Sequence, residues 1–175
     1  MTALVSVDDW SPLPGSVPET VDPSTVYVIP TRSPLAGDDD DVPRYTDHMR
    51  YFPKEARAAG APVEFSMPVG SRMYLSEFSI DPEMWALGLA VLTMANEWAI
   101  VAVQAFIDVR ARAQGWSTEE AADLPLQVKI TETETGTNYK IEGKGVEVLE
   151  AMRILNDQKK LRLGGRKGGK TGSNG

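Results

Sequence analysis

The chain of 175 residues contains no cysteine. It therefore has no disulfide framework, no thiolate nucleophile, no zinc ribbon and no cysteine-ligated iron–sulfur cluster. The first residues, 1–9, have neither the basic segment nor the apolar run of a secretory signal. Both absences are typical of proteins in a reducing compartment, so we expect a cytoplasmic protein.

Histidine is almost absent as well, since His48 is the only one. One interpretation makes His48 the base of a hydrolase-like enzyme, because imidazole titrates near neutral pH, but no motif places a serine nucleophile beside it. We expect a polar surface histidine and no catalytic residue. The acidic run 38–41 lacks the alternating spacing and the central glycine of a calcium loop, so no metal site is expected there.

Positive charge is concentrated at the C-terminal end of the chain. All 25 acidic residues precede Lys159, whereas six of the 18 lysines and arginines lie within residues 159–170. The glycine-rich stretch 161–175 is predicted to be a disordered basic tail, and nucleic acid or an anionic membrane would bind it only weakly, if at all. Its candidate contact residues are Arg162, Arg166, Lys167 and Lys170.

Residues 164–171 of the tail also match the consensus sequence of a phosphate-binding Walker A loop. Such a loop needs a strand before it and a helix after it, because fixed N–H groups and the helix N-terminus hold the phosphates. Here a helix is predicted before the loop and only four residues follow it. We therefore expect no nucleotide, no other cofactor and no small-molecule substrate.

In the first half of the chain, local patterns predict short strands around one helix. Residues 1–24 carry several prolines and no sustained period, which predicts an extended or disordered lead-in. A helix is predicted within 45–59, with a break or a fresh start at Pro53. Runs of β-branched or alternating apolar residues predict strands at 25–30, 63–67 and 74–80.

In the second half, a long apolar helix is predicted from Pro82 to about Gln114, with Asp81 as its cap and Gly115 as its stop. Ser117 and Glu120 have the spacing of a capping box. Alternating residues predict a hairpin over 126–143, and residues 146–160 recur at the spacing of a closing amphipathic helix. The fold class is α+β, with one domain over 25–160 or two sub-units, 25–80 and 81–160.

The stretch 85–107 is long enough to span a bilayer, and Glu97 is its one charged residue. An acidic residue near the midpoint argues against a span. At 100° per residue Glu97, Gln104 and Asp108 share one polar stripe, which favours a helix buried in protein or in an oligomer and leaves a membrane-associated segment as the alternative. The candidate interaction residues are Trp85, Leu92, Glu97, Trp98, Gln104 and Asp108.

The order of elements predicted for residues 84–158 resembles that of a known class of small proteins. The segments Leu126–Ile130 and Tyr139–Gly143, leading into a helix, resemble the small non-enzymatic effector-associated components of bacterial conflict (anti-phage) systems. The resemblance implies an adaptor role and carries over no functional residues. We expect an adaptor or assembly subunit that binds a protein partner or self-associates through the long helix and the hairpin. The alternatives are the membrane-associated component and the enzyme that uses His48.

Overall fold

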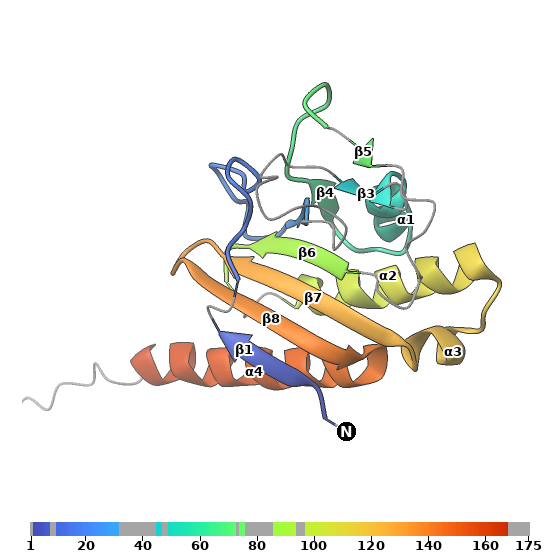
Figure 1. The fold of residues 1–175 in the computed structure, drawn as a ribbon. Coiled ribbons are helices and arrows are strands. Elements are labelled where there is room, and N and C mark those ends of the chain that lie inside the picture. Colours follow the sequence, from blue (N-terminus) through green and yellow to red (C-terminus); the bar gives the residue numbers. More distant parts are fainter. Residues whose placement is uncertain are drawn as a thin grey trace, which may run out of the picture.

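The computed structural model describes residues 2–7, 10–31, 45–46, 49–72, 74–75, 86–93 and 97–167. A six-stranded mixed sheet and helices packed against it make an α+β fold, as the sequence predicted (Figure 1). The strands are β1 (Leu4–Val7), β2 (Val26–Ile29), β3 (Tyr45–Thr46), β4 (Val63–Phe65), β5 (Tyr74–Leu75), β6 (Ala86–Val91), β7 (Pro125–Glu132) and β8 (Thr137–Lys144). The helices are α1 (Phe52–Ala58), α2 (Trp98–Gln114), α3 (Thr118–Ala122) and α4 (Gly145–Lys167).

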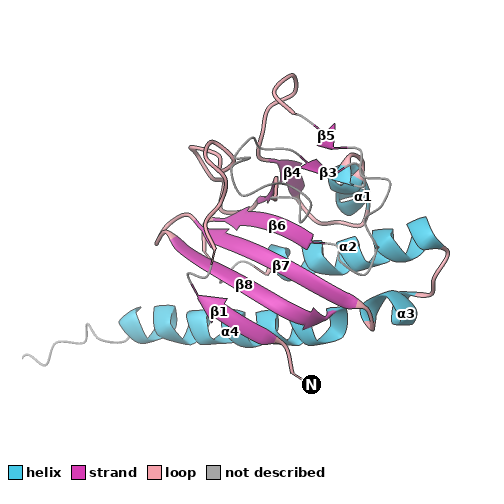
Figure 2. Ribbon diagram, in the orientation of Figure 1, coloured by secondary structure: helices cyan, strands magenta, loops and turns pink. Residues whose placement is uncertain are grey.

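The large sheet has the strand order β1-β8-β7-β6-β2-β4, and β3 pairs with β5 in a separate two-stranded sheet. Helices α2 and α4 lie against one face of the large sheet, and no described helix covers the other face over β6, β7 and β8 (Figure 2). The alternation along β7 follows from this: Val128 and Ile130 are buried on the helix side, whereas Gln127 and Lys129 point the other way and are half-buried.

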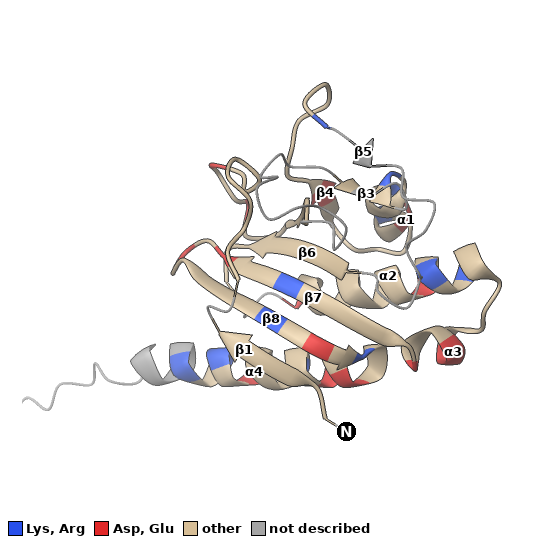
Figure 3. Ribbon diagram, in the orientation of Figure 1, with Lys and Arg blue, Asp and Glu red and all other residues tan. Residues whose placement is uncertain are grey.

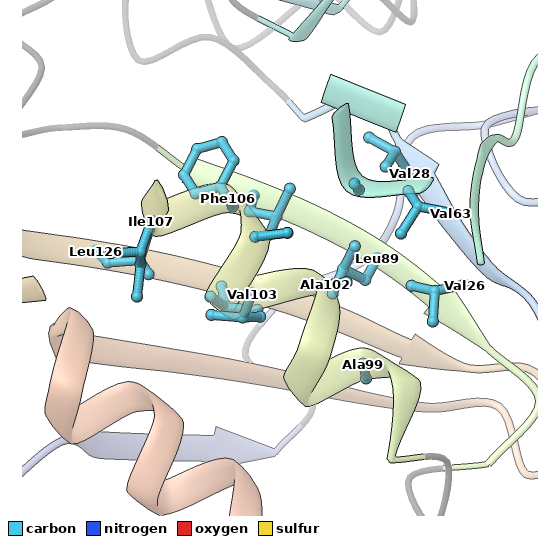
Figure 4. Close-up of a cluster of buried hydrophobic side chains, with 14 of the residues drawn as sticks. Val26, Val28, Val63, Leu89, Ala99, Ala102, Val103, Phe106, Ile107 and Leu126 are labelled. Carbon is cyan, nitrogen blue, oxygen red and sulfur yellow. The ribbon is translucent and has the colours of Figure 1, made fainter. Parts of the chain in front are cut away.

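Helix α2 packs against the central strands of the sheet. Small and apolar residues such as Ala99, Ala102 and Phe106 face the valines and leucines of the central strands (Figure 4). The buried Arg110 guanidinium donates from Nη1 to the carbonyl oxygen of Pro125 at 3.0 Å, which ties the end of α2 to the start of β7. Gly115 ends α2 with φ +70°, in the left-handed region that favours glycine, as predicted.

The hairpin over 126–143 and the capping box at Ser117 are confirmed, whereas the predicted cap Asp81 lies outside the described residues. Strands β7 and β8 pair along their whole length, from Pro125 opposite Lys144 to Glu132 opposite Thr137. The Ser117 hydroxyl accepts from the backbone N–H of Glu120 at 3.1 Å, as its capping-box spacing predicted.

The prediction of one helix over 82–114 is wrong. Residues Ala86–Val91 form strand β6, which runs between β7 and β2 in the middle of the sheet, and the helix begins at Trp98. The strand is apolar on both faces, so it lacks the alternation that reveals a half-buried strand, and its alanines and leucines read as helix formers. The described part of the chain holds no helix that is both long and apolar enough to cross a membrane.

The lead-in over 1–24, predicted to be extended or disordered, is extended at Leu4–Val7, where it forms a strand that the sequence did not predict. Leu4–Val7 pairs antiparallel with β8, with Val5 opposite Ile141, so the sequence folds as an edge strand. Trp10 Nε1 then donates to the carbonyl oxygen of Tyr139 at 2.7 Å. At the other end, α4 continues to Lys167, beyond the helix end expected at about residue 160, and residues 168–175 lie outside the described part.

Gly88 of β6 allows β2 to approach closely. A Cβ at this position would lie 2.8 Å from Ile29 Cγ1, 2.8 Å from Thr31 Cγ2 and 2.9 Å from the Ile29 carbonyl oxygen. Because one of these atoms belongs to the backbone, we expect Gly88→Ala to lower the free energy of unfolding by about 1–3 kcal/mol in urea denaturation. Thr31→Ser in the same background should recover part of the loss. An unchanged midpoint in Gly88→Ala would contradict the close approach.

Candidate functional site

A cleft opens where the parallel strands β6 and β7 end. The ladder between them extends past β6, because the backbone N–H of Thr133 donates to the carbonyl oxygen of Val91 and that of Glu134 to Leu92. The chain that leaves β6 enters α2 at Trp98, so the start of this helix lies at the same edge of the sheet. Crevices at the carboxyl ends of parallel strands are frequent binding sites.

The cleft has a volume of about 680 Å³, which is within the usual range for ligand pockets. Three segments far apart in the sequence form it: the turn before β2, the end of β6 with the start of α2, and the second half of α4. The lining residues are Pro23, Ser24, Thr93, Glu97, Trp98, Val101 and Lys160.

The cleft combines an aromatic ring with a charge pair. Glu97 Oε1 and Lys160 Nζ form an ion pair between α2 and α4, and both side chains are substantially exposed. Trp98 is 41% exposed, with Val101 one turn further along the helix. Because the two charges compensate each other, the cleft favours an apolar group flanked by polar ones over a strongly charged ligand.

A buried polar cluster fixes the part of α4 that reaches the cleft. Glu132, at the end of β7, points to the helix side and is 1% exposed. The Tyr139 hydroxyl donates to Glu132 Oε2 at 3.2 Å, and Lys159 Nζ lies 3.5 Å from the same oxygen. Burial raises the pKa of Tyr139, so its hydroxyl keeps the proton that it donates. Lys159 and Lys160 are consecutive. The contact of Lys159 with the buried Glu132 therefore also positions Lys160, which forms the exposed ion pair with Glu97.

Strands β7 and β8 carry charged residues of both signs (Figure 3). By the alternation along the two strands, Gln127, Lys129, Lys140 and Glu142 form a polar ladder on the face away from the helices. Lys140 Nζ lies 2.9 Å from Glu142 Oε1, and Gln127 Nε2 donates to the same carboxylate. The hydrogen bonds from Lys140 and Gln127 lower the pKa of Glu142. Lys129 lies directly opposite Lys140. Lys140 and Gln127 together satisfy the Glu142 carboxylate, as is common on a solvated sheet face.

Comparison with known proteins gives no relative: no protein-family model, no curated protein and no solved structure matches the chain. The residues themselves must therefore carry the functional argument. In the described part of the chain, no group of three or more histidine and acidic side chains is placed to hold a metal ion. What the cleft offers chemically is an aromatic contact surface with hydrogen-bonding groups at its rim.

Of the candidate interaction residues that the structure describes, Glu97 and Trp98 meet in the cleft. The half-buried Leu92 lies just before it. Gln104 and Asp108 lie further along α2, where Gln104 Nε2 donates to Asp108 Oδ1 at 3.4 Å. Trp85, His48 and the acidic run 38–41 are outside the described residues, as is Lys170. Of the other tail residues, Arg162 is exposed on α4, and Arg166 and Lys167 belong to its last turn.

Sequence reasoning missed the role of Lys160 and of Glu132. No local signal links Lys160 to Glu97, because 63 positions separate them and only the packing of α4 beside α2 brings them together. Glu132 did leave a signal. It continues the inward series of Leu126, Val128 and Ile130, so a carboxylate at that position predicts a buried polar contact.

Proposed function

We propose that this protein is a non-enzymatic adaptor or assembly subunit whose cleft binds a segment of a protein partner. The observation that carries the proposal is the exposure of Trp98 at the cleft. Phe52 and Phe106, two aromatic residues of the core, are at most 1% exposed, whereas Trp98 is 41% exposed. Tryptophan is enriched among the residues that dominate binding energy at protein interfaces.

The lining of the cleft supports a partner segment of a particular chemistry. An apolar side chain of the partner packs against Trp98 and Val101, and a polar group beside it hydrogen-bonds to the exposed ion pair of Glu97 and Lys160. An exposed ion pair contributes about 0–1 kcal/mol, so its members can exchange partners at little cost. Strand β6 removes the long helix from the element order that carried the resemblance, but the hairpin segments Leu126–Ile130 and Tyr139–Gly143 and the helix after them keep it. On that remaining resemblance to effector-associated components we include a bacterial defence system in the proposal.

The test first identifies the protein that co-purifies with this chain in stoichiometric amount from the native host. That partner is then purified, and its affinity for variants of this protein is measured. Trp98→Ala should weaken the partner's affinity at least tenfold in isothermal titration calorimetry, because the apolar anchor loses its contact surface. Val69→Ala is the matched control, since Val69 is 84% exposed on the loop between β4 and β5 and should leave the affinity unchanged.

Equal thermal melting of both variants would show that any loss is local to the cleft. The proposal fails if the purified partner binds Trp98→Ala as tightly as the wild type. It also fails if only a small molecule or nucleic acid co-purifies.

A further inference from the structure

Strand β1 has one free edge. Its neighbour in the sheet is β8, and no described strand pairs with its other side. Natural sheets block such edges with charged residues, proline or bulges, but the sequence Leu-Val-Ser-Val has no charge and no proline. Leu4 is 65% exposed and Val7 is 52% exposed. The edge therefore presents unpaired backbone groups together with apolar side chains on both faces.

We propose that β1 pairs antiparallel with β1 of a second copy of this chain, about a two-fold axis perpendicular to the sheet. The two six-stranded sheets then become continuous, with the helices of both copies on the same face. This contact involves none of the residues that line the cleft, so it stands independently of the adaptor proposal.

The alternation of side chains restricts the register of this pairing, and we propose the register centred on Val5. Residues 3, 5 and 7 point to the helix side and residues 4 and 6 to the other, so only side chains of the same parity can face each other. An axis at Val5 places Val5 opposite Val5 of the second copy, Ala3 opposite its Val7, and Leu4 opposite its Ser6. An axis at Ser6 would instead place the apolar Leu4 opposite a position that the sequence fills with Asp8.

The charges of α4 favour the same orientation. The helix runs along the strands, because Gly145 N–H donates to Leu124 before β7 starts and Lys159 reaches Glu132 where β7 ends. In the sheet, Val5 is level with Ile141 and, through it, with Val128, near the middle of β7 and therefore about midway between Gly145 and Lys159 of α4. The net charge of the helix changes sign near this level: Glu147 and Glu150 precede it, whereas one acidic residue, Asp157, and four basic residues follow it, namely Arg153, Lys159, Lys160 and Arg162.

A two-fold axis at this level sets the acidic start of each α4 toward the basic end of the other. Two copies of β1 separate these helices, so the attraction acts at long range and is screened by salt. It selects the antiparallel over the parallel arrangement and adds little to the affinity. A contact built on so short a strand is smaller than a standard interface, and we expect a micromolar dimer.

The absence of cysteine makes cross-linking a clean test. Residues directly opposite in antiparallel strands have Cβ atoms about 4.5–5.5 Å apart, close to disulfide geometry. We expect Val5→Cys to form a disulfide-linked dimer under mild oxidation at micromolar protein concentration. Val69→Cys, which is more exposed but lies outside β1, should cross-link at least tenfold more slowly. Equal rates for the two variants would overturn the proposal.

A charge-swap pair checks the register without cross-linking. Leu4→Glu with Ser6→Glu sets like charges opposite each other twice across the axis, and sedimentation should then find monomer only. Leu4→Lys with Ser6→Glu sets opposite charges in the same places and should retain the dimer. The wild type should be dimeric at protein concentrations 100-fold above the micromolar range. A wild-type monomer at that concentration, or the same oligomeric state for the two double variants, would exclude this pairing. Trp98→Ala should remain dimeric, which separates this outcome from the test of the cleft.

Discussion

Phe106→Ala is expected to lower the free energy of unfolding by about 3–5 kcal/mol. Phe106 is 1% exposed, and its ring meets that of Phe52 edge-to-face, with the centroids 5.4 Å apart. The pair joins α2 to α1, so truncation removes buried apolar area and an aromatic contact at once and leaves a cavity that the surrounding helices and sheet fill only partly.

Urea denaturation of Phe106→Ala and Phe106→Leu measures this effect. The leucine variant keeps most of the buried volume and should lose clearly less stability than the alanine variant. A loss below 1 kcal/mol in Phe106→Ala would show that α2 is not anchored through this ring.

Lys159→Met is expected to cost about 3 kcal/mol, because it leaves the Glu132 carboxylate buried without its cationic partner. The neighbouring substitution Lys160→Met is a matched control. Lys160 forms an exposed ion pair with Glu97, so its loss should cost less than about 1 kcal/mol. Two adjacent lysines on one helix should therefore differ several-fold in their effect.

The double variant Glu132→Leu with Lys159→Met tests the cause. Removing both charges also removes the buried unpaired carboxylate, so the double variant should be more stable than Lys159→Met alone. Chemical denaturation of the four proteins in this cycle gives the coupling between the two side chains. Additive effects, or equal losses for Lys159→Met and Lys160→Met, would show that the contact with Glu132 does not hold α4 in place.

The two proposals combine in a simple way. A dimer joined through β1 carries two copies of the cleft, because Trp98 and Lys160 lie on elements that do not take part in the strand pairing. A partner with two binding segments would then gain avidity from the dimer without any new contact. Disruption of β1 pairing should therefore weaken a bivalent partner more than a single peptide segment.

The candidate site could be predicted from the sequence only in part. Glu97 stood out as the one charged residue of 85–107, and both Glu97 and Trp98, predicted as interaction residues, line the cleft. Pro23 and Lys160 could not be linked to them, since nothing in their local sequence depends on residues so far away. Their meeting depends on α4 packing beside α2 and on the path of the chain into β2.

The sequence by itself determined the elements whose signals are local. The hairpin β7–β8, the Ser117 cap, the stop at Gly115 and the amphipathic α4 all follow from periodicity, capping and backbone preference within a few residues. Only the tertiary structure decided the state of Ala86–Val91 and Leu4–Val7. An apolar run without alternation suits a helix or a central strand equally, and a short uncharged run suits a loop or an edge strand. Ala86–Val91 pairs with β7 and Leu4–Val7 pairs with β8, so both segments are strands. Their backbone hydrogen bonds come from residues far along the chain, which no local signal can indicate.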